Sequence, residues 1–392
     1  SALFCLAILV FPFASYRPEI ESFITVASGQ ETKISGVQVN VFPVPGVVLE
    51  DVRIGSGRNQ ITIKEMRFLP EISSSFGQKK QLKIVVLSGA VLSPESFSRL
   101  PTIIDALMQP SSRVQVQQFR FEKTDLSFAS LTLPAMEGEV RLDEANRLKS
   151  VLWRSSDRSL SLDTVPAPTG LEFALEGYAW RPLAGSPFVF DSLTLKGKAE
   201  KSVVTLSSMD LRIFDGVIQG VALLQEDKKP ALSAEISFER INSARFGAAL
   251  GVGQLLSGEL AGKLALSSKA ESWEGLLASI AAQGDFIARR GAIRGIDLAE
   301  AVRRVSATPG QGGGTQFEQF SGKIMLKPGT LQLHDLFINS GLMQSSGTLE
   351  INKNESVSGK MDIQMRGSVN QNRIPVLISG QLKAPSVQIG KR

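Results

Sequence analysis

Apolar and polar residues alternate along most of the chain from residue 33 onward. Segments such as "GVVLEDVRIG" (46–55), "VQVQQFRFEKTDLSF" (114–128) and "SVVTLSSMDLRIF" (202–214) carry apolar side chains at nearly every second position. Gly, Pro, Ser, Asn or Asp separates these segments from one another. A period of two is that of β-strands, and short polar breaks are typical of successive hairpins. The pattern therefore predicts a mainly β protein, with far more strand than an ordinary globular domain has.

Helical spacing is confined to a few short segments. In residues 17–29, apolar residues lie at the i, i+3, i+4, i+7 positions of a helix, and Gly29 follows as a stop. Three further helices are predicted at 93–109, at 272–284 and at 295–305, where Asp297 is the expected cap. A weaker helix is expected to begin at Asn242. These helices are too few to cover a long sheet.

One unit of the pattern occurs twice in the chain. "MDLRIFDGVIQG" (209–220) and "HDLFINSGLMQS" (334–345) match at a constant offset of 125 residues, and looser echoes begin at Asp51 and Asp125. Such repetition is typical of an array of similar units. Asp-Gly and Ser-Gly are turn dipeptides, so each copy predicts one hairpin in which Gly216 or Gly341 lets the strands reverse.

The alternation raises the question of what covers the apolar side of the sheet. A meander of roughly 20 strands at about 4.8 Å spacing would be about 95 Å long. A second packed sheet, closure into a barrel, or a curled sheet whose lining contacts lipid would each hide that side. The alternation alone leaves these three arrangements open. The candidate lining residues are Val37, Val39, Val41, Leu211, Ile213, Leu336 and Ile338.

The first residues, "SALFCLAILVFPFA", form an uncharged apolar stretch. At about 1.5 Å per residue, a helix of about 14 residues spans about 21 Å, short of the roughly 30 Å bilayer core. The stretch therefore fits a truncated membrane anchor over residues 1–16, a signal-peptide core or a buried segment. We favour the anchor because Tyr16 and Arg17 suit a membrane interface. The expected anchor residues are Leu3, Phe4, Leu6, Ile8, Leu9, Val10, Phe11 and Phe13.

Composition argues against several classes of function. The chain has 392 residues, 43% of them hydrophobic and 21% charged, which is typical of a folded protein. The net charge of +5 is spread along the sequence, whereas nucleic-acid binders concentrate basic residues in one stripe. One cysteine, Cys5, and one histidine, His334, are too few for a common zinc site. Neither a Gly-x-Ser-x-Gly elbow nor a phosphate loop is present, so we expect no enzyme activity, no catalytic residue, no metal and no cofactor.

The order of segments at both ends resembles the AsmA family of bacterial envelope proteins. At the front, the resemblance lies in "RPEIESFITVASGQETKISGVQVNVFPVPGVVLEDVRIG" (17–55), a short helix followed by a strand, a turn with prolines and a second strand. Nearer the C-terminus it lies in "GELAGKLALSSKAESWEGLLASIAAQGDFIARRGAIRGIDLAEAVRRV" (258–305) and "TQFEQFSGKIMLKPGTLQLHDLFINSGLMQSSGTLEI" (315–351). The resemblance implies an inner-membrane anchor, a periplasmic body and a long curled antiparallel sheet that forms a β-groove. It also implies similarity to the chorein-type proteins that conduct lipids between membranes.

The resemblance defines the expected organisation and function. Residues 1–16 would be the single-pass anchor in the bacterial inner membrane, 17–250 an N-terminal β-groove region and 251–392 the AsmA-like C-terminal region. The protein would bind and conduct phospholipids along the groove and contribute to outer-membrane lipid homeostasis, with an envelope protein as a possible partner. The alternative is a non-enzymatic scaffold that assists the assembly of outer-membrane proteins, and a hydrolase is third. The densest basic stretch supplies the candidate headgroup contacts Arg289, Arg290 and Arg294, although helix-end and surface roles also suit them.

Overall fold

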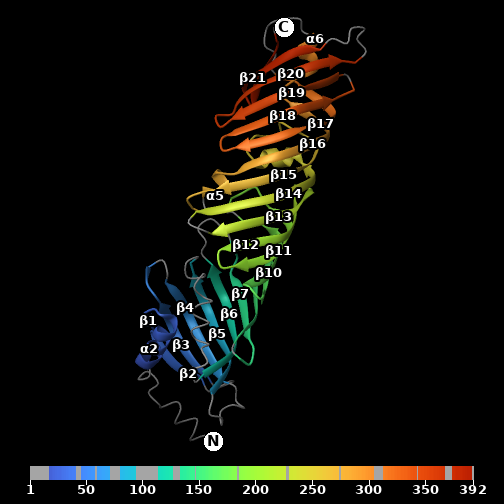
Figure 1. The fold of residues 1–392 in the computed structure, drawn as a ribbon. Helices are drawn as coiled ribbons and strands as arrows, with labels where there is room; N and C mark the ends of the chain where they lie inside the picture. The colour runs from blue at the N-terminus through green and yellow to red at the C-terminus, as the bar shows by residue number, and fades with distance from the viewer. Residues whose placement is uncertain are drawn as a thin grey trace, which may run out of the picture. The chain divides into compact units, whose positions relative to one another are not determined.

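The protein is mainly β, as the alternation predicts, and its strands belong to one 22-stranded sheet with a few short helices (Figure 1). The computed structural model describes residues 17–40, 46–57, 60–70, 80–93, 114–126, 133–145, 147–182, 185–226, 229–272, 275–303, 312–341, 343–366 and 373–390. Neighbouring strands are antiparallel with one exception: β5 (Lys80–Leu92) and β6 (Val114–Leu126) pair in parallel. The prediction of an antiparallel sheet is wrong for this pair. The 21 residues between these two strands let the chain return and enter β6 in the same direction.

The chain divides into two compact units, Ser1–Gly185 and Ser186–Arg392. We refer to them as unit 1 and unit 2. The boundary near residue 250 that the sequence suggests lies inside unit 2, between helix α4 (Ser243–Ala249) and strand β15 (Glu259–Lys269).

Among the residues described, unit 1 contains the first ten strands and the helix α2. Besides β5 and β6, its strands are β1 (Thr32–Lys33), β2 (Gly36–Asn40), β3 (Gly46–Ile54), β4 (Ile61–Pro70), β7 (Met136–Leu142), β8 (Leu148–Ser155), β9 (Leu160–Pro166) and β10 (Leu171–Trp180). Its core includes the fully buried Leu49 and Val52 of β3. Phe121 and Trp153 pack there with their ring centroids 5.0 Å apart.

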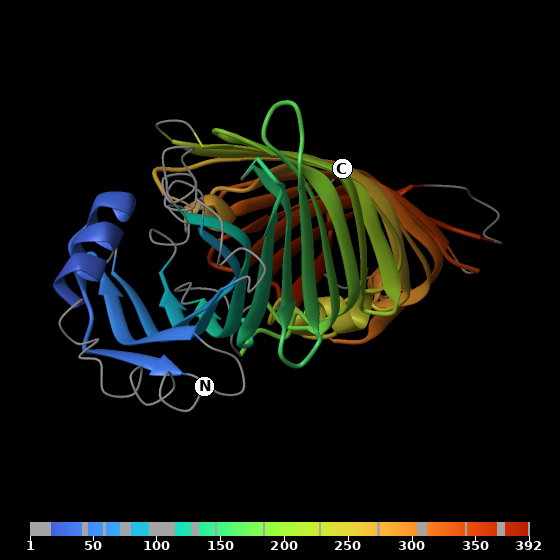
Figure 2. The same ribbon diagram turned by 90° about the horizontal axis from the view of Figure 1, so that it is seen from below.

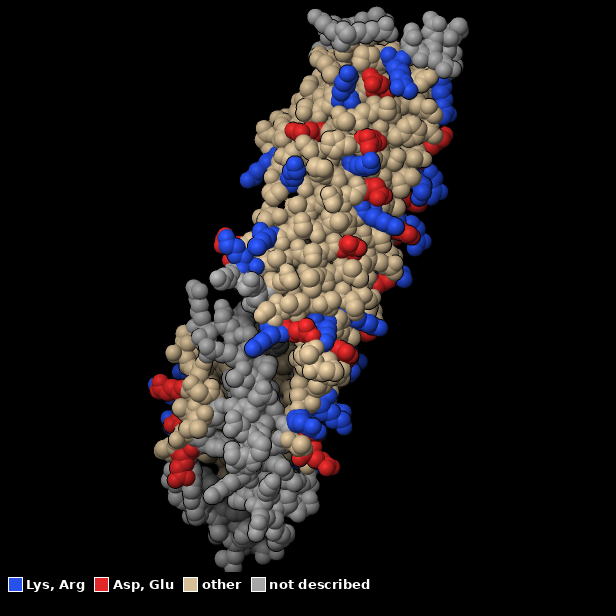
Figure 3. Space-filling model, viewed as in Figure 1, with Lys and Arg blue, Asp and Glu red and all other residues tan. Residues whose placement is uncertain are grey.

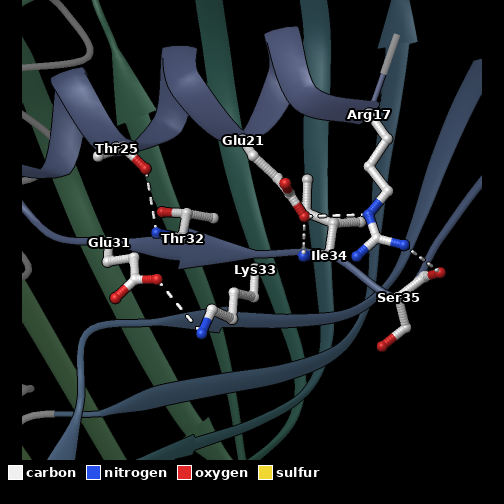
Figure 4. A network of polar contacts seen from close by, with 8 residues as sticks. All are labelled: Arg17, Glu21, Thr25, Glu31, Thr32, Lys33, Ile34 and Ser35. Carbon is white, nitrogen blue, oxygen red and sulfur yellow. Dashed lines mark hydrogen bonds and ion pairs between the residues drawn. The ribbon is translucent and has the colours of Figure 1, made fainter. Parts of the chain in front are cut away.

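The helix predicted at 17–29 is confirmed as α2 (Arg17–Ser28), which lies beside the first strands of unit 1 (Figures 1 and 2). Ile24 of α2 is buried in the unit 1 core. Polar contacts hold the helix to β1 and the residues after it (Figure 4). The Glu21 carboxylate accepts a 2.7 Å hydrogen bond from the Ile34 amide and a 3.1 Å bond from the Arg17 guanidinium. The Thr25 hydroxyl accepts a 3.0 Å bond from the Thr32 amide.

Unit 2 contains the remaining strands in one antiparallel succession, each paired with the next. The strands are β11 (Phe190–Glu200), β12 (Val203–Ile213), β13 (Gly216–Glu226), β14 (Pro230–Asn242), β15, β16 (Ala281–Arg294), β17 (Gly314–Lys327), β18 (Thr330–Asn339), β19 (Met343–Asn352), β20 (Ser356–Met365), β21 (Ile374–Gln381) and β22 (Ala384–Ile389). Because the strands alternate in direction, every second turn lies at the same edge of the sheet.

The helix predictions for unit 2 are confirmed at two of three places. Helix α4 begins after the N-cap Asn242, and α6 (Leu298–Arg303) begins after Asp297, whose carboxylate accepts a 2.8 Å bond from the Glu300 amide. The prediction of a helix over 272–284 is wrong for most of that range. Helix α5 is only Gly275–Ala278, because the residues from Ala281 onward pair with β15 as strand β16. Apart from Ser93, the helix predicted at 93–109 lies outside the described residues.

Both copies of the repeated unit are hairpins, β12–β13 and β18–β19, as predicted. The role expected for Gly216 is wrong. Phe214 and Asp215 make the turn, with φ of 51° and 64°, and Gly216 already pairs with Ile213 as the first residue of β13. A Cβ at Gly216 would lie 2.5 Å from the Glu239 carbonyl oxygen, so this glycine serves a close strand approach.

Candidate functional site

One face of the unit 2 sheet is apolar across all twelve strands. Two neighbouring ladders of register partners contain only apolar residues and glycine, and since partners share a face, these side chains form one continuous surface. We call this surface the apolar strip. The first ladder is Gly197, Leu206, Ala222, Ala234, Leu266, Ala282, Leu326, Leu331, Ile351, Val357, Gly380 and Pro385, and the second is Leu195, Met209, Gly220, Ile236, Leu264, Gly284, Ile324, Leu333, Leu349, Gly359, Ile378 and Val387.

Most large side chains of the apolar strip are only half-buried, whereas Val357, Ile378, Pro385 and Val387 on its last three strands are buried. Ten leucines and isoleucines in it keep part of their surface accessible: Leu206, Ile236, Leu264, Leu266, Ile324, Leu326, Leu331, Leu333, Leu349 and Ile351. In an ordinary packed core such side chains would be covered. From β11 to β19 the strip is therefore an apolar surface without a full second layer among the described residues.

The same face is fully buried next to the strip. Ten large side chains there are at most 8% exposed: Ile213, Phe238, Ile241, Phe286, Phe320, Leu336, Ile338, Met361, Ile363 and Val376. We call this region the buried half. Phe286 and Phe320 pack edge to face in it, with ring centroids 5.1 Å apart.

Helices α4 and α6 explain the difference between the two regions. Both lie at one edge of the sheet, and their residues Phe246 and Leu298 pack against the buried half. The Thr315 hydroxyl fixes the start of α6 by accepting a 3.0 Å bond from the Leu298 amide and donating to the Ile296 carbonyl at 2.8 Å. Helix α5, at the opposite edge, is shorter and buries Leu276, while Leu277 is 70% exposed. The cover is thus concentrated on one half of the face.

The other face of the same strands is polar. A ladder on it runs through Asp210, Gln219, Ser237, Lys263, Asp285, Lys323 and His334. Six of these residues, from Gln219 to His334, help to line a hollow of about 740 Å³ whose lining also includes five residues of the apolar strip: Gly220, Ile236, Leu264, Gly284 and Ile324. The Lys323 ammonium lies 2.8 Å from the Asp335 carboxylate, which lowers the pKa of Asp335 and raises that of Lys323.

His334, the sole histidine of the chain, is an exposed member of this polar ladder. Its register partner is Lys323. No group of three or more His, Cys, Asp or Glu residues within the described ranges could hold a metal ion.

Unit 1 carries an apolar ladder of the same kind. It runs through Val37, Leu49, Met66, Leu87, Phe121, Gly138, Trp153, Leu162 and Leu175. Its central members, from Leu49 to Trp153, are buried, whereas Leu162 and Leu175 are half-buried. In unit 1 the half-buried apolar surface is therefore shorter than the apolar strip of unit 2.

The candidate lining residues fall into different regions of the structure. Leu211 is half-buried, and Val37 and Val39 are half-buried on β2. Ile213, Leu336 and Ile338 belong to the buried half, at 2–3% exposure. Val41 lies outside the described residues, as do all the anchor candidates from Leu3 to Phe13. The strip residues that the sequence did not single out, such as Leu264 and Leu333, become visible only through the strand register.

The three candidate headgroup arginines lie at the edge that carries α4 and α6. Arg290 has a φ of 52° and donates to both carboxylate oxygens of Glu259, at 2.9 and 3.0 Å. Arg294 donates to the Gln254 side chain at 3.3 Å, and Arg289 is exposed opposite Glu259 and Gln319. These arginines therefore adjoin the buried half and not the apolar strip.

Two findings concern the expected membrane anchor and the expected family. Among the residues that the structure describes, no helix is long and apolar enough to span a bilayer. Compared with known proteins, the chain matches no family model, no curated protein and no solved structure.

Proposed function

We propose that the protein binds phospholipids by their acyl chains on the apolar strip and conducts them along the sheet. The observation that supports this most is the half-burial of the strip's leucine and isoleucine side chains on the strands from β11 to β19. Each CH₂ group that leaves water on such a surface contributes about 0.8 kcal/mol. Because the two ladders contain no polar residue, a chain meets no polar barrier from strand to strand. At about 4.8 Å per strand, the strip is about 50 Å long, which exceeds the length of one acyl chain.

A curled sheet with the strip on its inner side would form the groove. The strands of unit 2 bend along their length in Figure 2, and α4, drawn in yellow, lies on the inner side of the bend. Since α4 packs on the buried half of the apolar face, its position supports an inward-facing strip. Glycines favour such bending: a Cβ at Gly284 would lie 1.9 Å from the Lys263 carbonyl oxygen, so only glycine allows this approach of two strands.

The resemblance to the AsmA family supports the cellular setting of the proposal. In this setting the chain is anchored in the bacterial inner membrane by a single N-terminal span, and its body lies in the periplasm. It contributes to outer-membrane lipid homeostasis without enzyme activity. Lipid sliding along a continuous apolar surface requires no covalent chemistry.

A scaffold for outer-membrane protein assembly is the second candidate. Among the described strands, β22 pairs with β21 alone, so its other edge could accept a further strand. Addition of a strand to a free edge is a common mode of peptide recognition. This mode uses backbone groups at one edge and does not require a half-buried apolar surface.

Lipid analysis of matched variants tests the proposal. Leu266 is half-buried in the apolar strip, and Leu377 is 37% exposed on β21 on the opposite face. We expect Leu266→Asp to reduce the phospholipid that copurifies with the full chain in mild detergent by about tenfold, since a charge on the strip must be desolvated by acyl chains. Leu377→Asp should leave the bound lipid unchanged.

The same experiment distinguishes the two candidate functions. Circular dichroism of both variants shows whether the sheet remains folded. If the wild-type chain carries no lipid but captures an unfolded barrel strand, the scaffold replaces the lipid carrier. Equal lipid loss in both variants would mean that the strip is not the binding surface.

A further inference from the structure

Lysine residues lie in or directly before every turn at one edge of unit 2. This edge also carries α5, and we call it the α5 edge. Figure 3 shows blue side chains at intervals along this left-hand edge of unit 2, with fewer red ones between them. Because alternate turns of an antiparallel succession share an edge, six connections lie there. A lysine lies in each of these connections or is the last residue of the strand before it, and together these lysines form the lysine rim: Lys201, Lys229, Lys269, Lys327, Lys353 and Lys383.

At the opposite edge, which carries α4 and α6, the basic residues are mainly arginines, and they take part in contacts within the protein. Several arginines lie in the turns or strand ends there and contact the protein's own side chains. Arg245 pairs with Asp215, Arg290 with Glu259, and Arg366 donates to Asn339 at 2.7 Å. These contacts hold α4 and the strand ends that adjoin the buried half.

Fewer of the charges in the lysine rim are paired with carboxylates. Lys229 pairs with Glu271, and Lys383 lies 3.6 Å from Glu355. The other four, Lys201, Lys269, Lys327 and Lys353, are exposed and have no carboxylate within 4 Å among the described residues. A positive row of this kind attracts anions, and an ammonium group on a flexible stem suits phosphate as a point charge.

The rim follows the apolar strip closely on the later strands. Lys327 comes directly after the strip residue Leu326, Lys353 is two residues from Ile351, and Lys383 is two residues from Pro385. At about 3.3 Å per residue, each backbone position is within about 7 Å of the strip. Consecutive rim turns are two strands apart, which spaces the lysines by about 10 Å. Lys269 and Lys327 are the last residues of β15 and β17 and leave their strands on the polar face, so their side chains reach the strip around the edge of the sheet. Apolar surface and cation thus meet at this edge, as a molecule with acyl chains and a charged head requires.

We propose that the lysine rim holds the phosphate groups of anionic glycerophospholipids whose acyl chains lie on the apolar strip. The inference rests on the proposed function and names its substrate class. Successive lysines allow a headgroup to pass from one cation to the next while its chains slide along the strip. The arginines Arg289, Arg290 and Arg294 take no part in this contact, since they lie at the other edge.

The test compares two quadruple variants of the full chain with the same change in net charge. The rim variant carries Lys201→Gln, Lys269→Gln, Lys327→Gln and Lys353→Gln. The control variant carries Lys196→Gln, Lys263→Gln, Lys323→Gln and Lys360→Gln, all at exposed positions on the polar face. Each protein is equilibrated in mild detergent with phosphatidylglycerol or with a diacylglycerol of the same acyl chains, and bound lipid is measured by mass spectrometry.

We expect the rim variant to bind phosphatidylglycerol about two- to fivefold more weakly, the range for one exposed ion pair, and to keep its diacylglycerol binding. The control variant should bind both lipids as the wild type does. Added salt should weaken only phosphatidylglycerol binding, and only in proteins with an intact rim.

Three outcomes would overturn the proposal. If both variants lose phosphatidylglycerol equally, the effect is one of net charge. If the rim variant retains phosphatidylglycerol, or loses diacylglycerol as strongly, the lysines do not hold headgroups, while lipid binding itself stands. If the wild-type chain binds neither lipid, the proposed function fails as well.

Discussion

Two regions on one face of the unit 2 sheet are equally apolar but differ in cover. The buried half is rich in phenylalanine and isoleucine and lies under α4 and α6, whereas the apolar strip is rich in leucine, alanine and glycine and keeps part of its surface accessible. The difference shows that the alternation of residues fixes which side of a strand is apolar but not whether another element covers that side. Protein packs on one region, and we propose that lipid packs on the other.

Matched isoleucine substitutions test the difference between the two regions most directly. Ile363 is 0% exposed in the buried half, and Ile324 is half-buried in the apolar strip. We expect Ile363→Ala to lower the free energy of unfolding by about 2–5 kcal/mol, because it leaves a cavity in a packed region. Ile324→Ala should cost about 1 kcal/mol, since solvent or lipid can fill the space. Urea unfolding of unit 2, followed by near-ultraviolet circular dichroism, measures both.

Equal costs at the two positions would contradict the distinction between the regions. In that case, the strip would be part of an ordinary core. Lipid provides a second check, because added phospholipid should stabilise the wild-type chain and the Ile363→Ala variant alike by binding to the folded state.

The two repeat copies offer a second comparison. A Cβ at Gly216 would meet the Glu239 carbonyl oxygen at 2.5 Å, whereas a Cβ at the equivalent Gly341 would meet nothing within 4 Å. We expect Gly216→Ala to destabilise unit 2 by about 1–3 kcal/mol through strand displacement. Gly341→Ala should be nearly neutral. Thermal unfolding of the two variants measures the difference, and a neutral Gly216→Ala would show that these strands can separate without cost.

Much of the fold was predictable because its signals are local. The period of two, the cap residues Asn242 and Asp297, and the hairpins of the repeat each depend on a few neighbouring residues. The short α5 was not predictable in the same way. Its sequence suits a longer helix, but pairing of Ala281 and the following residues with β15 favours strand, and this partner is distant in the sequence. The parallel pair β5–β6 also depends on a contact between distant segments.

The candidate site was predictable only in outline. The sequence indicated an apolar sheet face, and Leu211 is indeed half-buried, but Ile213, two residues away on the same strand, is fully buried. The alternation cannot predict that Leu211 and Ile213 differ in burial, because the helices that cover the buried half come from other segments of the chain. The candidate headgroup residues Arg289, Arg290 and Arg294 are recognisable in the sequence because they are close together along the chain. The lysine rim is spread over six turns and strand ends, and it becomes a row only when the strands pair.

The contact between α2 and the strands of unit 1 depends on the charged Glu21 side chain, so it should depend on pH. Burial raises the pKa of Glu21, but the hydrogen bonds from the Ile34 amide and the Arg17 guanidinium outweigh this effect. The pKa of Glu21 is therefore below its ordinary value. A carboxyl group with a lowered pKa stabilises the fold above its unfolded value of about 4.3, and this contribution is lost as pH falls through the folded value. We expect hydrogen-exchange protection of the Ile34 amide to fall below about pH 4.

The Thr32 amide is the internal control for this prediction, since its acceptor is the Thr25 hydroxyl, which does not titrate in this range. Glu21→Gln should remove the pH dependence at Ile34 and weaken the helix contact by about 1 kcal/mol. Protection that falls equally at both amides would mean that α2 is released by a different group.

The smallest effect is expected on the polar face, at the exposed pair of Lys323 and Asp335. The hydrogen bond and charge of Lys323 lower the pKa of Asp335, so any stabilisation by the pair is present above the ordinary aspartate pKa and is lost as pH falls. Both groups are exposed, and solvent and salt screen them. Asp335→Asn should therefore leave the unfolding midpoint and the bound lipid unchanged, while Lys323→Gln should raise the pKa of Asp335 in an NMR titration. Loss of lipid in Asp335→Asn would place lipid on the polar face and reverse the assignment of the two faces.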